Sequence, residues 1–505
     1  PFLGGKSIST HNGDAFLAWL GEMNPESNGS SDLVAYFFRQ SFKLLRGNGT
    51  LGLIATNTIA QGDTRSTGLR YLCQNGGTIY DATRRYKWPG HAAVIVSVVH
   101  LYKGSYAGPR RLDGKPVPTL TAFLFHAGSH EDPQVLRANE GKSFIGSYVL
   151  GMGFTFDDTD KSGAASPLAD MHRLIQQDPR NQQRIFPYLG GEELNTSPTH
   201  APHRYVINFG ELTEEEARAW PDLLRIVEEK VKPERLKLAN NPDGIRRKTH
   251  WWLWGRYTPG LYSAIAGLDR VLALSLHSQY LTLAFLPARY VFSHALAVIA
   301  MDTYSAFGVM QSRIHEIWAR FFGSSLEDRL RYTPSDCFDT FPFPLGWEAD
   351  ARLESVGQAY YDFRAQLMIR SGEGLTKTYN RFHSRSDQAP DIQRLRALHA
   401  ELDRAVLSAY GWEDLATPCD FYPDHEPDEA SAGDQKPSYR YRFPDAVREE
   451  LLARLLDLNQ ARARDERLGA VPATAPAAKK PAAKKPAAAK KPAAAKKPGP
   501  APAPA

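Results

Sequence analysis

The first residues of the chain, PFLGGKSIS, contain residue types that bind phosphate groups. Gly5, Lys6 and Ser7 match the end of the pattern Gly-x-x-x-x-Gly-Lys-Ser/Thr, in which backbone N–H groups surround the phosphates of a nucleotide. The first glycine of that pattern would stand one residue before Pro1, so the pattern cannot be completed from this sequence. A nucleotide site is therefore one interpretation of this loop, and the later segments of the sequence are needed to choose between it and the alternatives.

A second chemically distinctive segment is the C-terminal tail at 471–505, where pairs of lysine alternate with proline and alanine. Removing its eight lysines from the net charge of +5 leaves −3 on the other 470 residues. Frequent proline blocks helix formation and no large apolar side chain can be buried, which predicts disorder. The tail is predicted to bind DNA without sequence preference, and a solubilising tail without a partner is the alternative. Its lysines are Lys479, Lys480, Lys484, Lys485, Lys490, Lys491, Lys496 and Lys497.

The bulk composition limits the class of protein. A chain of 505 residues with 42% hydrophobic residues is long enough for several domains with their own cores. It contains no run of eighteen apolar residues and no charged-then-apolar leader, which predicts a cytoplasmic protein without a membrane span. Three scattered cysteines are typical of a reducing compartment. His200 and His203 lack a third ligand at metal-binding spacing, so no metal site is predicted.

Residues 30–104 contain the elements that must position the first loop. The short apolar run TLGLIAT at 50–56 predicts a strand that is covered on both faces. A helix over DLVAYFFRQSFKLL precedes this strand, and GTIYDATRRY and AAVIVSVVHLY predict two later strands that pair antiparallel. A buried strand needs neighbours on both sides and only one side is supplied here. The region is therefore predicted to be the second half of a doubly wound α/β domain.

Three segments of this region resemble consecutive motifs of adenine-specific DNA methyltransferases. They are PFLGGKSIS, SSDLVAYFFRQSFKLLRGNGTLGLIATNTIAQGD and ATRRYKWPGHAAVIVSVVHLYK. The resemblance is greatest to large single-chain enzymes of type II restriction–modification and related phage-defence systems. It implies that residues 1–105 are the C-terminal half of a class I, Rossmann-like methyltransferase sheet. Pro1 and Phe2 would end the family's catalytic Asn-Pro-Pro-Phe motif, and the next residues, GGK, would belong to the same loop. The main site for S-adenosylmethionine would precede Pro1.

The chemistry of adenine methylation explains these residue types. The exocyclic amine of adenine is a poor nucleophile, so the motif's Asn side chain and the following carbonyl accept its hydrogens while the base is held outside the duplex. The resemblance assigns Phe2 to stacking on that base, and Trp88, or alternatively Tyr86, to its opposite face. A Trp beside Pro-Gly could equally fill the core of a turn. Asn57 would face the cofactor side of the sheet or cap the next loop.

Residues 181–345 resemble the target-recognition domain of the same enzymes, an α+β domain that follows a connector at 106–180. In this domain Thr213 is predicted to cap an acidic helix, with Glu216 completing a capping box. The segment from 311 to 322 has apolar residues at helical spacing, which predicts a helix that packs in the core.

The segment NPDGIRRKTHWWLWGRY holds the best basic and aromatic cluster before the tail. Arg246, Arg247 and Lys248 could reach phosphates or guanine edges, which predicts DNA contact. The alternative is a solvated turn followed by a buried aromatic strand. The aromatic residues of that strand would be Trp251, Trp252 and Trp254.

Residues 346–470 are predicted to be helical, since leucines recur at helical spacing in this region. The whole pattern predicts an adenine-N6 DNA methyltransferase, dependent on S-adenosylmethionine and associated with the nucleoid. Its partner would be double-stranded DNA, and whether a restriction nuclease or another defence subunit accompanies it stays open. A noncatalytic DNA-binding specificity module is the alternative function. A chromatin-like protein that relies on its tail is a third.

Overall fold

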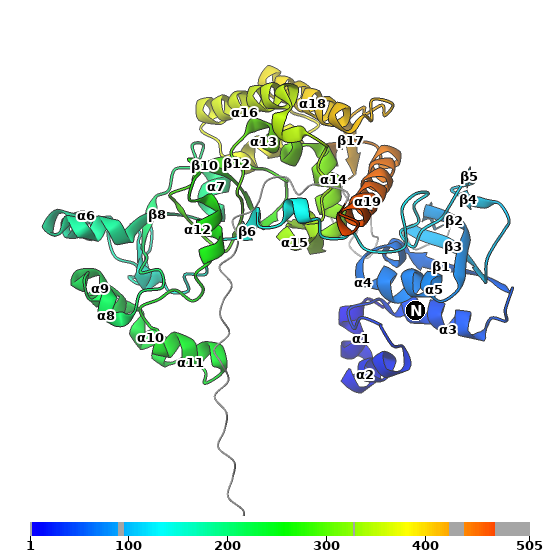
Figure 1. Ribbon diagram of the computed structural model, residues 1–505, viewed down its shortest axis with the longest axis horizontal. Helices are drawn as coiled ribbons and strands as arrows, with labels where there is room; N and C mark the ends of the chain where they lie inside the picture. The colour runs from blue at the N-terminus through cyan, green and yellow to red at the C-terminus, as the bar shows by residue number, and fades with distance from the viewer. Residues whose placement is uncertain (1–2, 89–94, 327–328, 424–438, 470–505) are drawn as a thin grey trace, which may run out of the picture.

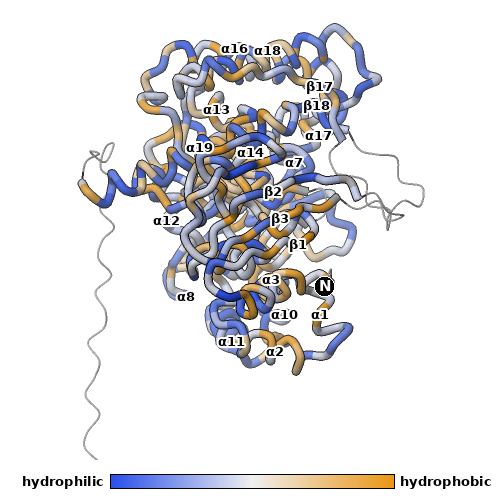
Figure 2. Tube along the Cα trace, turned by 90° about the vertical axis from the view of Figure 1, so that its right-hand side faces the viewer, coloured by the Kyte–Doolittle hydropathy of each residue, from blue (hydrophilic) through white to orange (hydrophobic). Residues whose placement is uncertain are grey.

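The computed structural model describes residues 3–88, 95–326, 329–423 and 439–469 (Figure 1). The chain folds into several small sheets and many helices, so the predicted mixed α/β class is confirmed. Figure 2 shows α16 (Ala351–Ser371) and α18 (Pro390–Tyr410) at one end of the molecule and α1 (Gly5–Asn12) and α2 (Asp14–Met23) at the other. No helix of the described residues is long and apolar enough to cross a membrane.

The N-terminal region is built around a five-stranded sheet with the order β1-β3-β2-β4-β5. Its strand β3 pairs antiparallel with both β1 and β2, which confirms the predicted antiparallel pair, and β2 pairs parallel with β4. The helix α3 (Leu33–Leu44) buries Phe38 and Phe42 in the core that it shares with this sheet. The strands are β1 (Thr50–Thr56), β2 (Gly77–Lys87), β3 (Ile95–Lys103), β4 (Arg110–Leu112) and β5 (Lys115–Val117).

Strand β1 is not covered on both faces, so that expectation was wrong. Its residues alternate between partly buried and exposed, and Ile54 is 39% exposed while Ala55 is fully buried. Among the described strands β1 has one neighbour, β3, and it therefore lies at the edge of the sheet. The run is apolar enough for burial on both faces, but among the described residues only the face of β1 toward α3 is packed in a core.

Residues 57–74 connect β1 to β2 through a chain of short helical turns. They are η1 (Asn57–Ala60), α4 (Gly62–Arg65), a π-helical turn η2 (Ser66–Arg70) and α5 (Tyr71–Gln74). Single π-helical turns are rare and are frequently found at functional sites. The connection after β1 therefore carries a local feature that is typical of such sites.

Residues 143–299 form two further sheets. One has the order β12-β10-β14-β6 and the other β13-β8-β9-β7. The strands are β6 (Ser143–Ile145), β7 (Thr155–Phe156), β8 (Ile185–Leu189), β9 (Arg204–Ile207), β10 (Arg270–Ser275), β12 (Ala284–Pro287), β13 (Val291–Phe292) and β14 (Leu296–Ile299). The helices are α6 (Leu168–Gln177), α7 (Gly191–Thr196), α8 (Glu214–Ala217), α9 (Pro221–Lys230), α10 (Lys232–Leu236), α11 (Pro242–Thr249) and α12 (Pro259–Ile265). Thr213 caps α8 and exchanges hydrogen bonds with Glu216, so the predicted capping box is confirmed.

The remaining helices form a body that packs against the β10 sheet. A single hydrophobic core runs from that sheet through α14 to α18 and α19. Two small sheets lie at its edges, one with the order β11-β16-β15 and the other a pair of β17 and β18. Their strands are β11 (His277–Ser278), β15 (Ser324–Leu326), β16 (Arg329–Arg331), β17 (Asp420–Pro423) and β18 (Tyr439–Arg442). The helices are α13 (Tyr304–Gln311), α14 (Arg313–Phe322), α15 (Pro334–Cys337), α16, α17 (Leu375–Phe382), α18 and α19 (Asp445–Arg467). The last helix, α19, returns to the N-terminal sheet (Figure 1).

Candidate functional site

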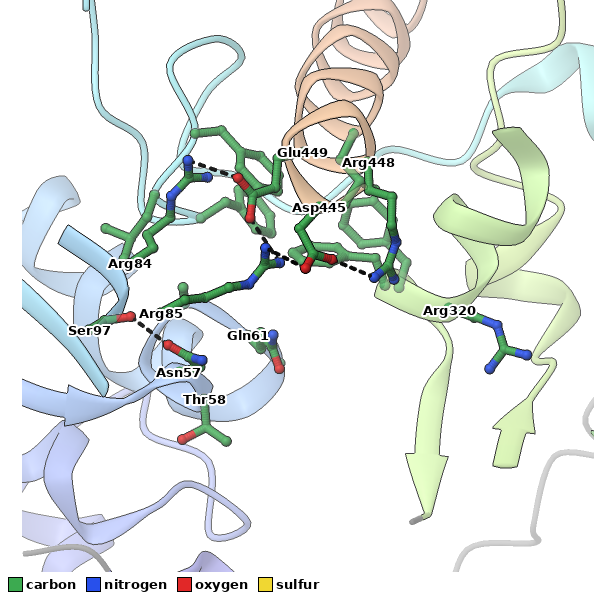
Figure 3. Close-up of a pocket in the computed structure, with 18 of the residues that line it drawn as sticks. Asn57, Thr58, Gln61, Arg84, Arg85, Ser97, Arg320, Asp445, Arg448 and Glu449 are labelled. Carbon is green, nitrogen blue, oxygen red and sulfur yellow. Dashed lines mark hydrogen bonds and ion pairs between the residues drawn. The ribbon is translucent and has the colours of Figure 1, made fainter. Parts of the chain in front are cut away.

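A cavity of about 900 Å³ lies between the N-terminal sheet and the helical body (Figure 3). One side is formed by the turn that follows β1 and by the end of β2. The other side is formed by the end of α14 and the beginning of α19. The carboxyl end of a strand in an open α/β sheet is where ligands usually bind, and β1 ends at this cavity. The cavity is therefore the main candidate for a substrate site in the described structure.

Asp32 fixes the first loop to the turn that follows β1. It stands at the N-cap position of α3, but its carboxylate does not bond its own helix. Instead it accepts the backbone N–H of Gly5 at 3.2 Å and the hydroxyl of Thr58 at 2.7 Å. The N–H of Leu33 donates to the carbonyl of Leu3 at 2.9 Å, which ties the same loop to the start of α3.

The first loop approaches the backbone of residue 30 very closely. A Cβ atom added to Gly5 would lie 2.1 Å from the Ser30 carbonyl oxygen, so this position requires glycine. Gly5 also begins α1, which corrects the expectation that the GGK segment is entirely loop. Helix formation here leaves the Gly5 N–H free to bond Asp32, since the first N–H groups of a helix have no partner within it.

A β-bulge presents two arginines to the cavity. In the β2–β3 ladder, Thr83 pairs with Val98 and Tyr86 with Val96, so Arg84 and Arg85 oppose the single residue Ser97. Neighbouring residues of a regular strand point to opposite faces, but a bulge with one residue in the left-handed region changes this. Arg85 has φ +50°, a conformation that costs about 1–2 kcal/mol for a residue with a Cβ. Figure 3 shows both arginine side chains directed toward α19.

Two carboxylates of α19 bind these arginines. Glu449 lies 2.8 Å from Arg84 Nη2 through one oxygen and 2.8 Å from Arg85 Nη2 through the other, so it bridges both guanidinium groups. Asp445 lies 3.3 Å from Arg85 Nη1. Arg84 has a further partner in Asp113, at 2.6 Å.

Asp445 is shared with arginines from its own side of the cavity. Arg442 Nη1 donates to it at 2.8 Å and Arg448 Nη1 at 3.1 Å. Burial alone would raise the pKa of Asp445, but Arg85 and Arg442 lower it below its usual value, so the carboxylate is charged at neutral pH. Burial raises the pKa of Glu449, and burial lowers the pKa of Arg448 to about 10. The cluster is thus a dense set of opposite charges that are partly withdrawn from water.

Aromatic rings form an apolar part of the cavity wall. The rings of Phe125 and Phe321 lie 5.4 Å apart, and Phe123 stacks on Phe125 at 5.7 Å. The guanidinium of Arg65 lies 3.8 Å from the centre of the Phe123 ring and hydrogen-bonds the His130 carbonyl at 2.7 Å. The cavity therefore combines an apolar wall with charged and hydroxyl groups, as a site for a planar polar ligand would.

Of the residues predicted to stack on the target base, the structure describes Tyr86 and Trp88. Pro1 and Phe2 lie outside the described residues, so their predicted roles stay predictions. Tyr86 is 45% exposed and Trp88 is 38% exposed, so neither side chain is fully buried, and the stacking roles of both stay predictions. Asn57 lines the cavity at the end of β1, and its side-chain oxygen accepts the Ser97 hydroxyl at 2.9 Å.

The predicted DNA-contacting trio lies on α11, far along the chain from this cavity. Arg247 pairs with Asp243 at 2.8 Å, Arg246 with the same carboxylate group at 3.1 Å, and Lys248 Nζ donates to Asn240 at 2.6 Å. The three tryptophans that follow are buried and lie in a turn, so the expectation of an aromatic strand was wrong. The eight tail lysines lie outside the described residues.

The charged cluster at the cavity was not predicted from the sequence. Arg84 and Arg85 were visible in a predicted strand, but nothing in the sequence indicated the bulge that turns both toward one side. Their partners on α19 stand more than 350 positions later, and only the folded chain brings them together. Among the described residues no group of three or more His, Cys, Asp or Glu side chains could hold a metal ion.

Known proteins resemble this chain in sequence and in fold. Residues 165–345 match the family described as "MmeI, target recognition domain". The chain is 21% identical over 430 residues to DNA methyltransferase A of Bacillus subtilis (strain 168), a match that covers 81% of this chain and 44% of the relative. Its fold is similar to that of the type IIL restriction-modification enzyme MmeI, solved in complex with DNA, with a TM-score of 0.54 and 20% identity.

That structural similarity covers 92% of this chain and 56% of the solved chain, so the chain spans about half the length of the relatives it matches. The resemblance to methyltransferases of type II restriction–modification systems is confirmed at this level. Residues 165–345 thus match the MmeI target recognition domain family, within a chain that is similar to a type IIL restriction–modification enzyme and, more distantly, to a DNA methyltransferase.

Proposed function

We propose that this chain is the C-terminal portion of a DNA methyltransferase that transfers a methyl group from S-adenosylmethionine to N6 of adenine, within a restriction–modification or related defence system. The match of residues 165–345 to a target recognition domain carries the proposal, since such a domain selects a DNA sequence for an attached enzyme. The strand order of the N-terminal sheet supports its assignment as the second half of a class I methyltransferase sheet, because β3 lies between β1 and β2 and is antiparallel to both.

The residues of this chain would act around the target base. Asp32 holds the loop that follows Phe2, so Phe2 would be presented at a fixed position for stacking. Trp88 is exposed beyond the end of β2 and is available for the opposite face of the base, with Tyr86 as the alternative. Flipping the base costs a few kcal/mol, and stacking on aromatic rings offsets part of this cost.

The cofactor would be held mainly by residues outside this sequence. In the described residues the turn after β1, Asn57–Gly62, contains a single glycine and no glycine-rich nucleotide-binding pattern. The described residues of this turn therefore offer no glycine-rich site for S-adenosylmethionine. For the same reason we expect the chain alone to bind the cofactor weakly and to transfer no methyl group.

The test is to join this chain to an N-terminal half that ends in Asn-Pro and carries a glycine-rich cofactor turn. The joined enzyme is expected to form N6-methyladenine at one fixed duplex site, measured by mass spectrometry of digested DNA. In that enzyme Phe2→Ala should weaken binding of the flipped base by about 1–3 kcal/mol, seen as brighter fluorescence of 2-aminopurine at the target position. Methylation of cytosine alone would contradict the adenine assignment.

The second candidate function is a noncatalytic specificity module, which the target recognition domain favours if the chain acts as it stands. Both functions require sequence-selective binding of double-stranded DNA. We propose that Arg246, Arg247 and Lys248 contribute to that selectivity and that the tail lysines add affinity for any sequence. Deleting residues 471–505 should flatten the dependence of log affinity on log salt by about 0.9 for each phosphate that the tail had neutralised, with the preferred sequence unchanged.

A further inference from the structure

The charged cluster between the β2 bulge and α19 consists of Arg84, Arg85, Asp445 and Glu449. We propose that Arg84 and Arg85 form a binding site for the phosphate backbone of DNA, and that Asp445 and Glu449 occupy this site in the DNA-free protein. The inference rests on the proposed function in one respect, namely that the ligand is DNA. It names a site and a competing segment of the chain that the family similarity does not assign.

The bulge provides the first argument. A regular strand would send Arg84 and Arg85 to opposite faces of the sheet, and here an unfavourable left-handed residue places both on the side of the cavity. Bulges recur next to active sites because they redirect side chains in this way. Two adjacent guanidinium groups on one side of a cavity form a concentrated positive site, and arginine is the residue best suited to bind paired phosphate oxygens.

The geometry of the carboxylates provides the second argument. Glu449 bridges Arg84 and Arg85 with one oxygen on each guanidinium, both at 2.8 Å. Two oxygens of one phosphate group could make the same pair of contacts, because phosphate and carboxylate bind arginine in the same fork-like geometry. The carboxylates of α19 thus stand where a phosphate group would be bound.

In such an exchange Asp445 and Arg84 would each keep another partner, while Glu449 would be released from Arg84 and Arg85, the two arginines that it pairs with among the described residues. Asp445 keeps Arg442 at 2.8 Å and Arg448 at 3.1 Å when it releases Arg85. Arg84 keeps Asp113 at 2.6 Å. The other charged residues that line the cavity already have partners or lie on its other walls, and they are Asp32, Asp63, Arg320 and Asp336.

The location of the cluster provides the third argument. It borders the cavity of about 900 Å³ into which the end of β1 opens, and exposed Trp88 follows β2 after the bulge. A DNA strand whose base entered this cavity would bring its own phosphates close to the rim. Displacement of α19 from Arg84 and Arg85 would then accompany DNA binding, so α19 acts as an internal competitor.

The test compares two double variants of the full chain in binding a fluorescent DNA duplex of about 30 base pairs at several salt concentrations. Asp445→Asn/Glu449→Gln removes the competitor and is expected to tighten binding about tenfold and to leave the salt dependence at least as steep. Asp457→Asn/Asp465→Asn is the matched control. It removes the same charge from the same helix at positions that take part in none of the ion pairs found among the described residues.

The reciprocal variant, Arg84→Gln/Arg85→Gln, is expected to weaken binding about tenfold and to lower the salt slope by about two. Its control is Arg370→Gln/Arg404→Gln, which changes two exposed arginines on α16 and α18. Should the double carboxylate variant fail to fold in melting experiments, Glu449→Gln alone leaves Asp445 to neutralise its neighbours and should show a smaller gain of the same sign.

Equal affinities of Asp445→Asn/Glu449→Gln and its control would overturn the proposal while leaving the proposed function standing. The same holds if Arg84→Gln/Arg85→Gln binds DNA as its control does. A wild-type chain that binds no DNA at all would overturn both. Tighter binding by the carboxylate variant together with weaker binding by the arginine variant supports the exchange of carboxylate for phosphate.

Discussion

The N-terminal region and the helical body differ in which side chains they bury: the first leaves large apolar side chains exposed, and the second buries several charged ones. The N-terminal sheet packs one face of β1 and leaves Ile54 on that strand 39% exposed, and the helices α3 and α2 of the same region expose Phe37 and Trp19 further. The body buries even its charged groups, with Arg313, Arg364 and Asp403 each at most 3% exposed. The body is thus closely packed around its charged groups, whereas the N-terminal region carries apolar surface that is suited to further contacts.

Acid provides the largest expected separation of the two regions. Burial lowers the pKa of His315 to about 3, and lowers the pKa of His383 and His399 well below the usual value. These histidines are neutral in the folded body and would take up protons on unfolding below pH 6.5. The stability they represent is therefore present above pH 6.5 and is lost as the pH falls toward 4.

At about 1.4 kcal/mol per pH unit for each of these three histidines, the body should lose roughly 4–6 kcal/mol between pH 7 and 5. Urea unfolding followed by tryptophan fluorescence at several pH values measures this loss. His315→Gln keeps a hydrogen-bonding group near Tyr332 and should make the pH dependence shallower. A stability that stays constant from pH 7 to 5 would contradict the neutral, buried state of these side chains.

The buried ion pair of the body gives the next largest effect. Arg313 Nη1 lies 2.6 Å from Asp403 Oδ2, and both side chains are at most 3% exposed. Asp403→Ala should destabilise the body by about 3–5 kcal/mol, because it leaves a buried guanidinium without its carboxylate.

The exposed pair between Arg454 and Asp414 is the control for this prediction. Their atoms approach to 2.6 Å, yet Asp414 is 60% exposed. Asp414→Ala should cost much less than Asp403→Ala, since water and salt screen the interaction. Chemical denaturation of both variants compares the two pairs directly, and similar losses would show that burial does not distinguish them.

Amide hydrogen exchange compares the local stability of single strands in the two regions, and here the expected difference is smallest. Amides of β1 are expected to exchange at least about tenfold faster than amides of β10, because β1 is an edge strand with a partly open face and β10 is paired on both sides. Mass spectrometry of exchanged peptides resolves both strands in one experiment. Equal protection would show that the exposed face of β1 does not weaken its region.

Local signals in the sequence predicted several of these elements. The leucine spacing in 390–410 and 445–467 led to α18 and α19, and the pairing of Thr213 with Glu216 led to the cap of α8. Each depends on residues within a few positions of one another. The predicted pair β2 and β3 also lies close in sequence, and it is present with the expected antiparallel direction.

Features that depend on distant residues could not be predicted in this way. The left-handed conformation of Arg85 is imposed by the ladder around it, since arginine has no intrinsic preference for it. The cavity combines side chains from the turn after β1, from α14 and from α19. The core shared by the β10 sheet and the C-terminal helices is likewise a property of the assembled chain.

The return of α19 to the start of the chain has a consequence for biosynthesis. Glu449 pairs with Arg84, and Asn459 hydrogen-bonds residue 134 through both its amide oxygen and its amide nitrogen. A ribosome adds about 5–20 residues per second, so the N-terminal sheet waits on the order of half a minute before these partners emerge. During that interval its arginines and apolar edge are open to other molecules in the cell, and a chaperone or nucleic acid can bind the nascent region first.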